Sequence, residues 1–395
     1  MKLVSYTLLC SLIAIILPST RQNELTDWIE SKGGWAHLSV GPVNEGGLRG
    51  TLATRDIAEG DTLAYIPKEL VIQFGAPGNN RPPENAARLL GRQRREAGWH
   101  AAFLPYWRSL PALGSPTLFC KELFTERHIA LLQDPGMEWV VREEIATAVD
   151  IYNGTSTWWQ RLLGLAPPVS LHLNLPKGAE HDVTWEEFAH TTCLVGAYAF
   201  GCRGGWGGSQ VCMVPLLDMI NHAHPDTANT VVHQDTRNGS YGCTAIKNIT
   251  AGQEVTHTYS ATALRSDYSL LHYGFVLEME RPLLAGNDHI ARFEYSDDDL
   301  YSQHERLLSH EEAQRLNDIL KSFPTTEEED LQLLRESSDK LDGREREIIR
   351  FRIQRKRALR QMPLLGIKNK FEMINKELIA EIELPERVNK PLPVS

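Results

Sequence analysis

The chain has 395 residues, is 42% hydrophobic and carries a formal net charge of −10, with a pI near 5.8. A chain of this length and apolar content can bury substantial cores, and we expect two or three domains. Its acidic balance is not the electrostatic footprint of a protein that binds nucleic acid. The six cysteines lack the paired spacing of zinc sites, and their positions suggest no disulfide framework.

The N-terminus has the form of a targeting leader. Lys2 precedes an uncharged apolar run from Leu3 to Leu17, and Pro18 follows it. The run is too short for a membrane span and is typical of a secretory signal. We therefore predict a signal or targeting leader over residues 1–22 and a mature chain that is not embedded in a membrane. A signal-anchor or the start of a plastid leader are the alternatives, and without a functional leader the chain would be cytoplasmic or nuclear.

Short elements follow the leader. Residues 24–34 predict an amphipathic helix that Gly33 and Gly34 terminate. Strands are predicted over 52–54 and 62–66, on either side of a turn at Gly60. The loop before them, NEGGLRG, contains three glycines but lacks the Lys-Ser/Thr of a phosphate loop. Such a loop is most often only a turn, although it also lets a ligand approach the backbone closely.

The middle of the chain is predicted to be helical and then to return to strands. A proline- and glycine-rich linker at residues 77–83 precedes predicted helices over 86–99, 126–132, 139–152 and 185–200, with 106–111 as a bracing element. Strands are predicted over 230–234, 241–245 and 254–259, with Asn238-Gly239 as a hairpin turn. The segment NITAGQEVTHTY is similar to the earlier RDIAEGDTLAYI, which predicts two similar strand–turn–strand elements.

The composition changes near Glu278. Charged helices are predicted over 309–323, 327–341 and 344–359, and their charge runs are most simply solvated faces. This change predicts a separate helical domain at the C-terminus.

The stretch from Val214 to Thr230 concentrates polar groups behind an apolar run. Asn221 and His222 follow Asp218 by three and four residues, which predicts one shared face of a helical turn. Three interpretations stay open. Asp218 could be a helix cap beside satisfied surface groups. A metal could bind Cys212, Asp218, His222 and His224, although their spacing matches no common zinc motif. The stretch could also bind a small polar ligand.

Four stretches together resemble SET-domain methyltransferases of the class typified by Rubisco large-subunit lysine methyltransferase. They are GGLRGTLATRDIAEGDTLAYIP, YWRSLP, MVPLLDMINHAHPDTANT and TYSATALRSDYSLLHYGFV. The resemblance covers about residues 24–278, and the remaining tail only by architecture. It implies an α+β fold, in which a SET domain of short β-strands with a pseudoknot and a helical insertion precedes an all-α domain. The implied boundaries are a leader at 1–22, SET segments at 23–76 and 186–280, the insertion at 77–185 and a helical substrate-binding-like domain at 281–395.

The resemblance also implies a site for S-adenosylmethionine and a protein lysine. The implied cofactor-binding residues are Leu48, Arg49, Gly50, Asp218, Asn221, His222 and Tyr273. The implied substrate-binding residues are Phe200, Tyr259 and Phe275, and Tyr273 and Tyr259 are the implied catalytic residues. No metal is expected, as in this class. Ala197 to Phe200 stand where the family commonly has Ser-Arg-x-Phe, so that Tyr198 replaces an arginine and Phe200 keeps the aromatic wall.

The chemistry of methyl transfer suits these residue types. A neutral amine attacks a sulfonium methyl group in line, so the protein must align the partners and surround positive charge with oxygen dipoles and aromatic faces. A dry aromatic channel also lowers the pKa of a lysine, and no dedicated base is needed. The sequence therefore predicts a protein-lysine N-methyltransferase whose helical domain docks a protein substrate. A non-catalytic SET-fold binding protein and a protein-histidine methyltransferase are the alternatives.

Overall fold

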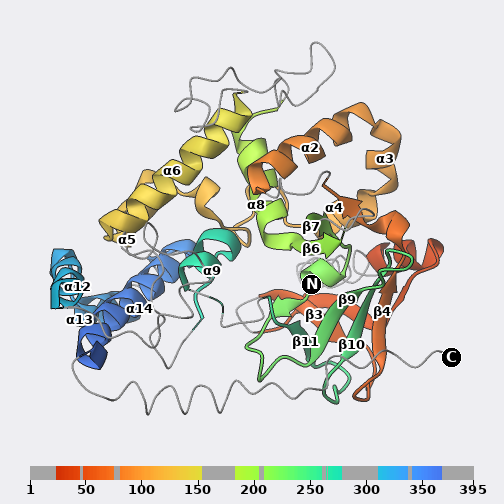
Figure 1. Cartoon of the computed structure of the whole chain (residues 1–395). Helices are drawn as coiled ribbons and strands as arrows, with labels where there is room; N and C mark the ends of the chain where they lie inside the picture. The colour runs from red at the N-terminus through yellow and green to blue at the C-terminus, as the bar shows by residue number, and fades with distance from the viewer. Residues whose placement is uncertain are drawn as a thin grey trace, which may run out of the picture. The chain divides into compact units, whose positions relative to one another are not determined.

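The computed structural model describes residues 24–44, 48–74, 81–153, 183–203, 209–259, 264, 266–277, 310–336 and 340–366 (Figure 1). The predicted leader at residues 1–22 lies outside these ranges. The chain divides into two compact units. The first unit comprises Met1–Phe124, Arg142–Leu264 and Leu271–Gly274, and the second comprises Thr125–Val141, Arg265–Leu270 and Phe275–Ser395.

Three small sheets form the β part of the first unit (Figure 1). The first sheet has the order β1 (Trp35–Ala36), β4 (Thr62–Ile66), β10 (Tyr241–Ala245) and β9 (Thr230–Gln234). The second has the order β2 (Leu38–Pro42), β3 (Arg49–Ala53), β11 (Glu254–His257) and β8 (Asn221–His222). The third has the order β5 (Ile72–Gln73), β7 (Ser209–Met213) and β6 (Ala199–Arg203).

Glycine turns explain why several strands could be predicted from sequence. Strands β4, β9 and β10 have the predicted bounds, and β9 and β10 pair around a turn at Gly239, where φ is +78°. The two similar strand–turn–strand elements are also confirmed. Their turns place Gly60 and Gly252 at φ of +91° and +79°, and Ile57 bridges Ile249 between them. A positive φ favours glycine because it has no Cβ.

The helical insertion departs from its predicted bounds at three places, and one of them is α6 (Pro135–Tyr152), which begins four residues before its predicted start. The helix predicted over 86–99 is two helices, α2 (Pro82–Arg95) and α3 (Ala97–Ala102), because Glu96 between them leaves helical geometry at φ −114° and ψ 64°. The helix predicted over 185–200 ends earlier, as α8 (Trp185–Tyr198), and Ala199 is already extended. Phe200 therefore lies on strand β6, paired with Cys212 of β7, and not on a helix.

Most of the core of the first unit lies between the sheets. The apolar run that leads to Asp218 is buried from Met213 to Leu217, and it packs in one core with Leu63 and Ile66 of β4. A smaller core joins α2 to α8 through Leu90 and Phe188. At roughly 25 cal/mol per Å² of apolar surface, this burial fixes the strand ends that present the polar groups.

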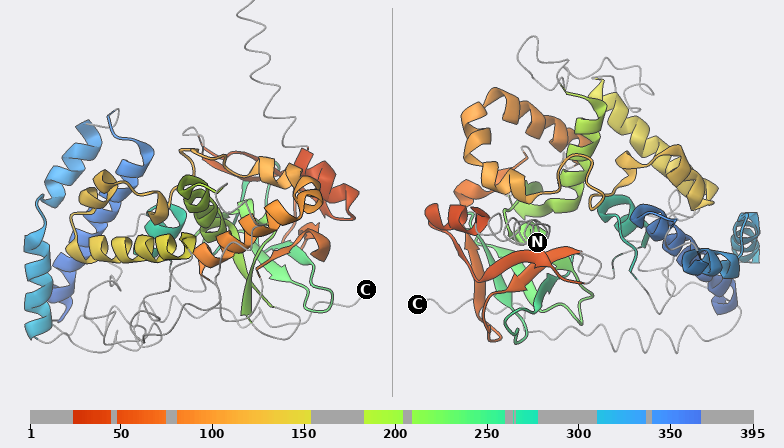
Figure 2. Two further views of the ribbon diagram at one scale, coloured as in Figure 1. Left: turned by 90° about the horizontal axis from the view of Figure 1, so that it is seen from above. Right: turned by 180° about the vertical axis from the view of Figure 1, so that it is seen from behind.

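The second unit is helical (Figures 1 and 2). Its helices are α5 (Glu126–Leu132), α12 (His310–Ser322), α13 (Glu327–Glu336) and α14 (Gly343–Gly366), and parts of α6 (Pro135–Tyr152) and α9 (Ser266–Tyr273) also belong to it. The charged helices predicted for the C-terminus are present, although α13 ends five residues before its predicted end. Among the described residues, no helix combines the length and apolar character that crossing a membrane requires.

Candidate functional site

The Asn221-His222 pair lies on a strand and not on a helix. Asp218 belongs to a 3-10 turn, η3 (Leu217–Met219), after which Ile220 is extended and β8 begins. β8 pairs in parallel with β11, so that Asn221 lies opposite Thr256 and His222 opposite His257. The predicted shared helical face is therefore wrong, because neighbouring side chains on a strand point to opposite faces.

Asn221 ties strand β8 to strand β3. Its amide nitrogen donates to the Arg49 carbonyl oxygen at 3.0 Å and to Glu254 Oε1 at 2.8 Å. A Cβ on Gly50 would lie 2.5 Å from that nitrogen, so only glycine permits this approach. Within the described structure Asn221 Oδ1 stays available as an acceptor, because the amide hydrogens are committed to the two strands.

His222 has a defined tautomer. Its Nδ1 accepts a hydrogen bond from the Tyr259 backbone N–H at 3.0 Å, so the neutral ring carries its hydrogen on Nε2. Burial, together with the nearby His224, lowers the pKa of His222 to about 4. The ring is therefore neutral near pH 7 and presents an N–H donor at Nε2.

Five rings form what we call the aromatic cluster: Phe200, His222, His257, Tyr259 and Tyr273. Tyr259 is central, with ring centroids 5.1 Å from His222, 5.0 Å from His257 and 4.9 Å, edge to face, from Tyr273. Phe200 packs 5.6 Å from His257. The sequence-predicted His222 and Tyr273, 51 residues apart along the chain, thus both pack against the ring of Tyr259.

The two tyrosines of the cluster are held differently. Tyr259 donates its hydroxyl to the Ile220 carbonyl oxygen at 3.0 Å, and burial raises the pKa of this phenol, so it stays protonated. Tyr273 is fixed through its neighbours in the chain. Gly274 has φ +77°, and a Cβ there would lie 2.4 Å from the Phe119 carbonyl oxygen. On the other side, His272 Nδ1 lies 3.3 Å from Lys121 Nζ.

A disulfide joins the segment that supports Tyr273 to helix α8. Cys120 and Cys193 are both buried, and their Cα atoms lie 5.6 Å apart. The sequence-based expectation of no disulfide is therefore wrong, because the two residues are 73 positions apart and no short spacing signals their contact. Their sulfur atoms and a Glu122 carboxylate oxygen form a group of metal-ligand type. No such group in the described part of the chain contains Asp218, His222 or His224, so the proposed metal interpretation of that stretch is not supported.

Asp218 is a buried carboxyl group with one strong partner. Tyr106 donates its hydroxyl to Asp218 Oδ2, whereas Oδ1 has no hydrogen bond to any described residue. Burial raises the pKa of Asp218 well above its usual range, although the Tyr106 hydrogen bond and the Arg49 charge oppose this. The helix-cap interpretation is wrong, since Leu216 occupies the N-cap of η3 and no side chain caps it.

The guanidinium group of Arg49 lies beside Tyr198. Its guanidinium donates to the Tyr198 hydroxyl at 3.1 Å through Nη2 and to the Ser109 carbonyl oxygen through Nη1. Burial raises the pKa of Tyr198, and the Arg49 charge partly offsets this. A guanidinium thus lies beside position 198, supplied by strand β3 instead of by helix α8.

The remaining predicted residues are less closely linked to the cluster. Leu48 is 55% exposed and directly follows residues outside the described ranges. Phe275 falls in the second unit, so its role in closing the pocket stays a prediction. His257 was missed by the sequence analysis. The available signal was its spacing of two from Tyr259 on a predicted strand, which puts both side chains on one face.

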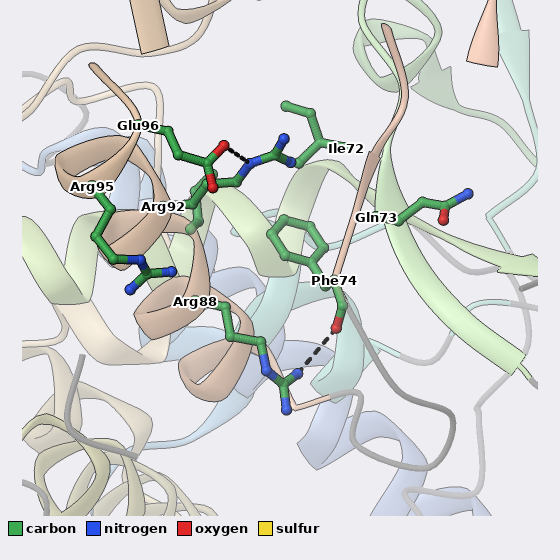
Figure 3. Close-up of a pocket in the computed structure, with 8 residues that line it drawn as sticks. Ile72, Gln73, Phe74, Arg88, Arg92, Arg95 and Glu96 are labelled. Atoms are coloured by element: carbon green, nitrogen blue, oxygen red, sulfur yellow. Dashed lines mark hydrogen bonds and ion pairs between the residues drawn. The ribbon is translucent and has the colours of Figure 1, made fainter. Parts of the chain in front are cut away.

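A separate cavity of about 190 Å³ lies between strand β5 and helix α2 (Figure 3). Its lining includes the arginines at 88, 92 and 95 on α2, and Figure 3 shows Arg88 bonded to the Phe74 carbonyl oxygen and Arg92 paired with Glu96. None of the sequence-predicted site residues lines this cavity.

Comparison with known proteins finds a similar sequence and similar folds among methyltransferases. A curated relative, the N-lysine methyltransferase setd6 of Danio rerio, is 24% identical over 254 residues, and the match spans 57% of this chain but only half the length of that relative. The solved SET domain of LSMT bound to lysine and AdoHcy superposes with a TM-score of 0.58 at 16% identity, covering 91% of this chain and 92% of the other. Rubisco LSMT bound to AdoMet gives a TM-score of 0.57 at 16% identity, covering 91% and 93%.

Two family models match consecutive parts of the sequence. The Rubisco LSMT substrate-binding model matches residues 268–359, most of which lie in the second unit. The SET-domain model matches residues 48–260, more than half of the chain, and includes Asn221, His222 and Tyr259. The chain therefore belongs to the SET-domain family.

Proposed function

We propose that this chain is an S-adenosylmethionine-dependent protein-lysine N-methyltransferase. The observation that carries the proposal is the aromatic cluster, in which Tyr259 touches both His222 and Tyr273. Ring faces and phenol oxygens in a buried setting stabilise positive charge at a sulfonium and at a methylated amine. The relative named as an N-lysine methyltransferase supports the same activity.

The donors and acceptors around the cluster fit the cofactor. Asn221 Oδ1 offers an acceptor, His222 Nε2 offers a donor and Arg49 offers a cation for a carboxylate. The unpartnered Oδ1 of Asp218 adds a further polar atom in the same region. When bound, S-adenosylmethionine supplies a methyl group that is already activated by the sulfonium. The family arginine that Tyr198 replaces has a counterpart here in the Arg49 guanidinium.

The residues of the chain then have the following roles. Phe200 and Tyr259, which both pack against His257, would line the lysine side chain, and their dry environment would favour loss of the ammonium proton to water before reaction. With the cofactor bound, the lysine nitrogen lone pair would form a bond to the methyl carbon while the carbon–sulfur bond would break in line. Tyr273, which packs edge to face against Tyr259, would supply its hydroxyl oxygen dipole to the positive charge at the methyl group. The second unit, which contains most of the match to the substrate-binding model, docks the protein that carries the lysine.

The experiment is transfer of an isotopically labelled methyl group from S-adenosylmethionine to proteins of a hypomethylated lysate. The full chain should label a protein whose hydrolysate contains methyllysine, and Tyr273→Phe should lower the rate by about 10²–10³-fold, the loss typical of one preorganised dipole. Tyr152→Phe is the matched control, because that hydroxyl binds the Val183 carbonyl oxygen in a different core, and it should keep the wild-type rate.

Three results would contradict the proposal in different ways. Methylhistidine in the hydrolysate would make the chain a histidine methyltransferase. Cofactor binding without transfer would favour the non-catalytic SET-fold protein. Equal rates for Tyr273→Phe and the wild-type chain would remove Tyr273 from the mechanism.

The leader is part of the proposal. Residues 1–22 direct the chain to the secretory pathway or the plastid, and a buried disulfide such as Cys120–Cys193 supports an oxidising compartment for the mature chain. A fluorescent fusion of the full chain should localise to an organelle, and the same fusion without residues 1–22 should be diffuse. Identical diffuse patterns would contradict a functional leader.

A further inference from the structure

His257 is a polar side chain within the aromatic cluster that the proposed mechanism does not use. It ends strand β11, and Tyr259 follows two residues later with its ring centroid 5.0 Å from that of His257. On its other side the ring meets Phe200 at 5.6 Å. The imidazole is 7% exposed, so it lies between the two groups proposed as walls for the lysine side chain.

One nitrogen of this ring has no partner. His257 Nε2 makes no hydrogen bond to any residue that the structure describes. The ring does hydrogen-bond to the main chain at Thr258, and that bond favours the protonated state of the nitrogen involved. The bonded nitrogen is therefore Nδ1, which acts as a donor, and Nε2 keeps a lone pair. Leaving a buried acceptor unpaired is costly, and an N–H group of a bound ligand would satisfy it.

The surroundings keep the imidazole neutral. Burial, together with the nearby His222, lowers the pKa of His257 to about 4. His222 is itself neutral near pH 7 because its pKa is also about 4. A cationic imidazole here would repel both a substrate ammonium and a sulfonium, whereas a neutral one offers a lone pair to an N–H group.

We propose that His257 is a positioning residue for the acceptor amine, whose Nε2 accepts a hydrogen bond from an N–H of the substrate lysine and thereby limits how many methyl groups are added. This inference rests on the proposed function. A neutral primary amine has two N–H groups and a monomethylamine has one, so both can donate to Nε2. A neutral dimethylamine has none, so it loses this alignment. The chain should therefore form mono- and dimethyllysine and very little trimethyllysine.

The test compares His257→Gln with His257→Met in the full chain. Gln and Met have side chains of similar length and neither is branched at Cβ, but only Gln keeps an acceptor in place of Nε2. The probe is S-adenosylmethionine with a trideuterated methyl group, incubated with a hypomethylated lysate, and mass spectrometry of hydrolysed protein counts the added methyl groups. Thermal unfolding of both variants checks that they are equally folded.

We expect His257→Gln to keep the wild-type product ratio. His257→Met should slow the first transfer by about tenfold, the worth of one aligned hydrogen bond, and should raise the share of trimethyllysine. Equal rates and ratios for the two variants would overturn the role of His257 while leaving the proposed function intact. If the wild-type chain labels no protein, the proposed function and this role fall together. If His257→Met unfolds, His257→Leu replaces it as the variant without an acceptor.

Discussion

Two buried aspartates, one in each unit, are satisfied to very different extents. Asp330 in the helical unit is fully buried and accepts four hydrogen bonds, from Arg352 twice, at 2.5 and 2.9 Å, from Lys356 at 2.6 Å and from Thr325 at 2.7 Å. Asp218 in the first unit is 5% exposed, and its Oδ1 has no hydrogen-bond partner within the described structure. The hydrogen-bonding capacity of the Asp330 carboxylate is filled, whereas one oxygen of Asp218 can still accept hydrogen bonds.

This difference distinguishes a buried carboxyl group that stabilises the fold from one that can bind a ligand. A buried ion pair stabilises a fold only if its hydrogen-bonding capacity is filled, because each ion loses several kcal/mol of hydration. The Asp330 network meets this condition and fixes α13 against α14. Near the aromatic cluster, Asp218 Oδ1 and His257 Nε2 do not meet it. Spare capacity of this kind is what a binding site needs, since a ligand can then complete the hydrogen bonds.

The largest effect should follow from Asp330→Asn. The substitution removes the negative charge between two buried cations and leaves Arg352 and Lys356 uncompensated. We expect the free energy of unfolding to fall by about 3–5 kcal/mol, measured by urea denaturation.

The matched control is Asp218→Asn, which makes the same chemical change in the other unit. The amide oxygen can still accept from Tyr106, and the carboxyl it replaces has a raised pKa. Its cost should stay below about 1 kcal/mol. An equal loss in the free energy of unfolding for Asp330→Asn and Asp218→Asn would contradict this difference between the two aspartates.

The disulfide should have the next largest effect. Replacing Cys120 and Cys193 together by alanine removes a cross-link that closes a 73-residue separation, which typically lowers the free energy of unfolding by about 2–4 kcal/mol. A thiol reductant should lower the denaturation midpoint of the wild-type chain and leave that of the double variant unchanged. If the reductant leaves the denaturation midpoint of the wild-type chain unchanged, the cross-link is contradicted.

The smallest effect is a pH dependence of stability that arises in the aromatic cluster. The pKa of His257 is about 4 in the folded chain, below its ordinary value of 6.5, so the unfolded chain takes up the proton first as the pH falls. The corresponding stability is present above about pH 6.5 and is lost between pH 6.5 and 4, by on the order of 1–3 kcal/mol. Over this range the denaturation midpoint of the wild-type chain should fall more steeply than that of His257→Gln. Parallel curves would show that His257 does not titrate with a lowered pKa.

Local features of this chain could be predicted from the sequence because short-range physics controls them. Strands β4, β9 and β10 and helix α5 have their predicted bounds, since glycine turns and apolar periodicity act within a few residues. Helix α8 was predicted two residues too long, because the pairing of Ala199 with Met213 ends it and no local signal marks that point.

The sequence by itself determined the family motifs, the order of the elements and the candidate residues Asn221, His222, Tyr259 and Tyr273. Only the tertiary structure decided that Asn221 binds the strand of Gly50, that Cys120 reaches Cys193 and that His257 lies between Phe200 and Tyr259. Apart from that of His257 with Tyr259, these contacts join positions tens to more than a hundred residues apart. They depend on which buried faces pack together, and local backbone preference carries no information about that choice.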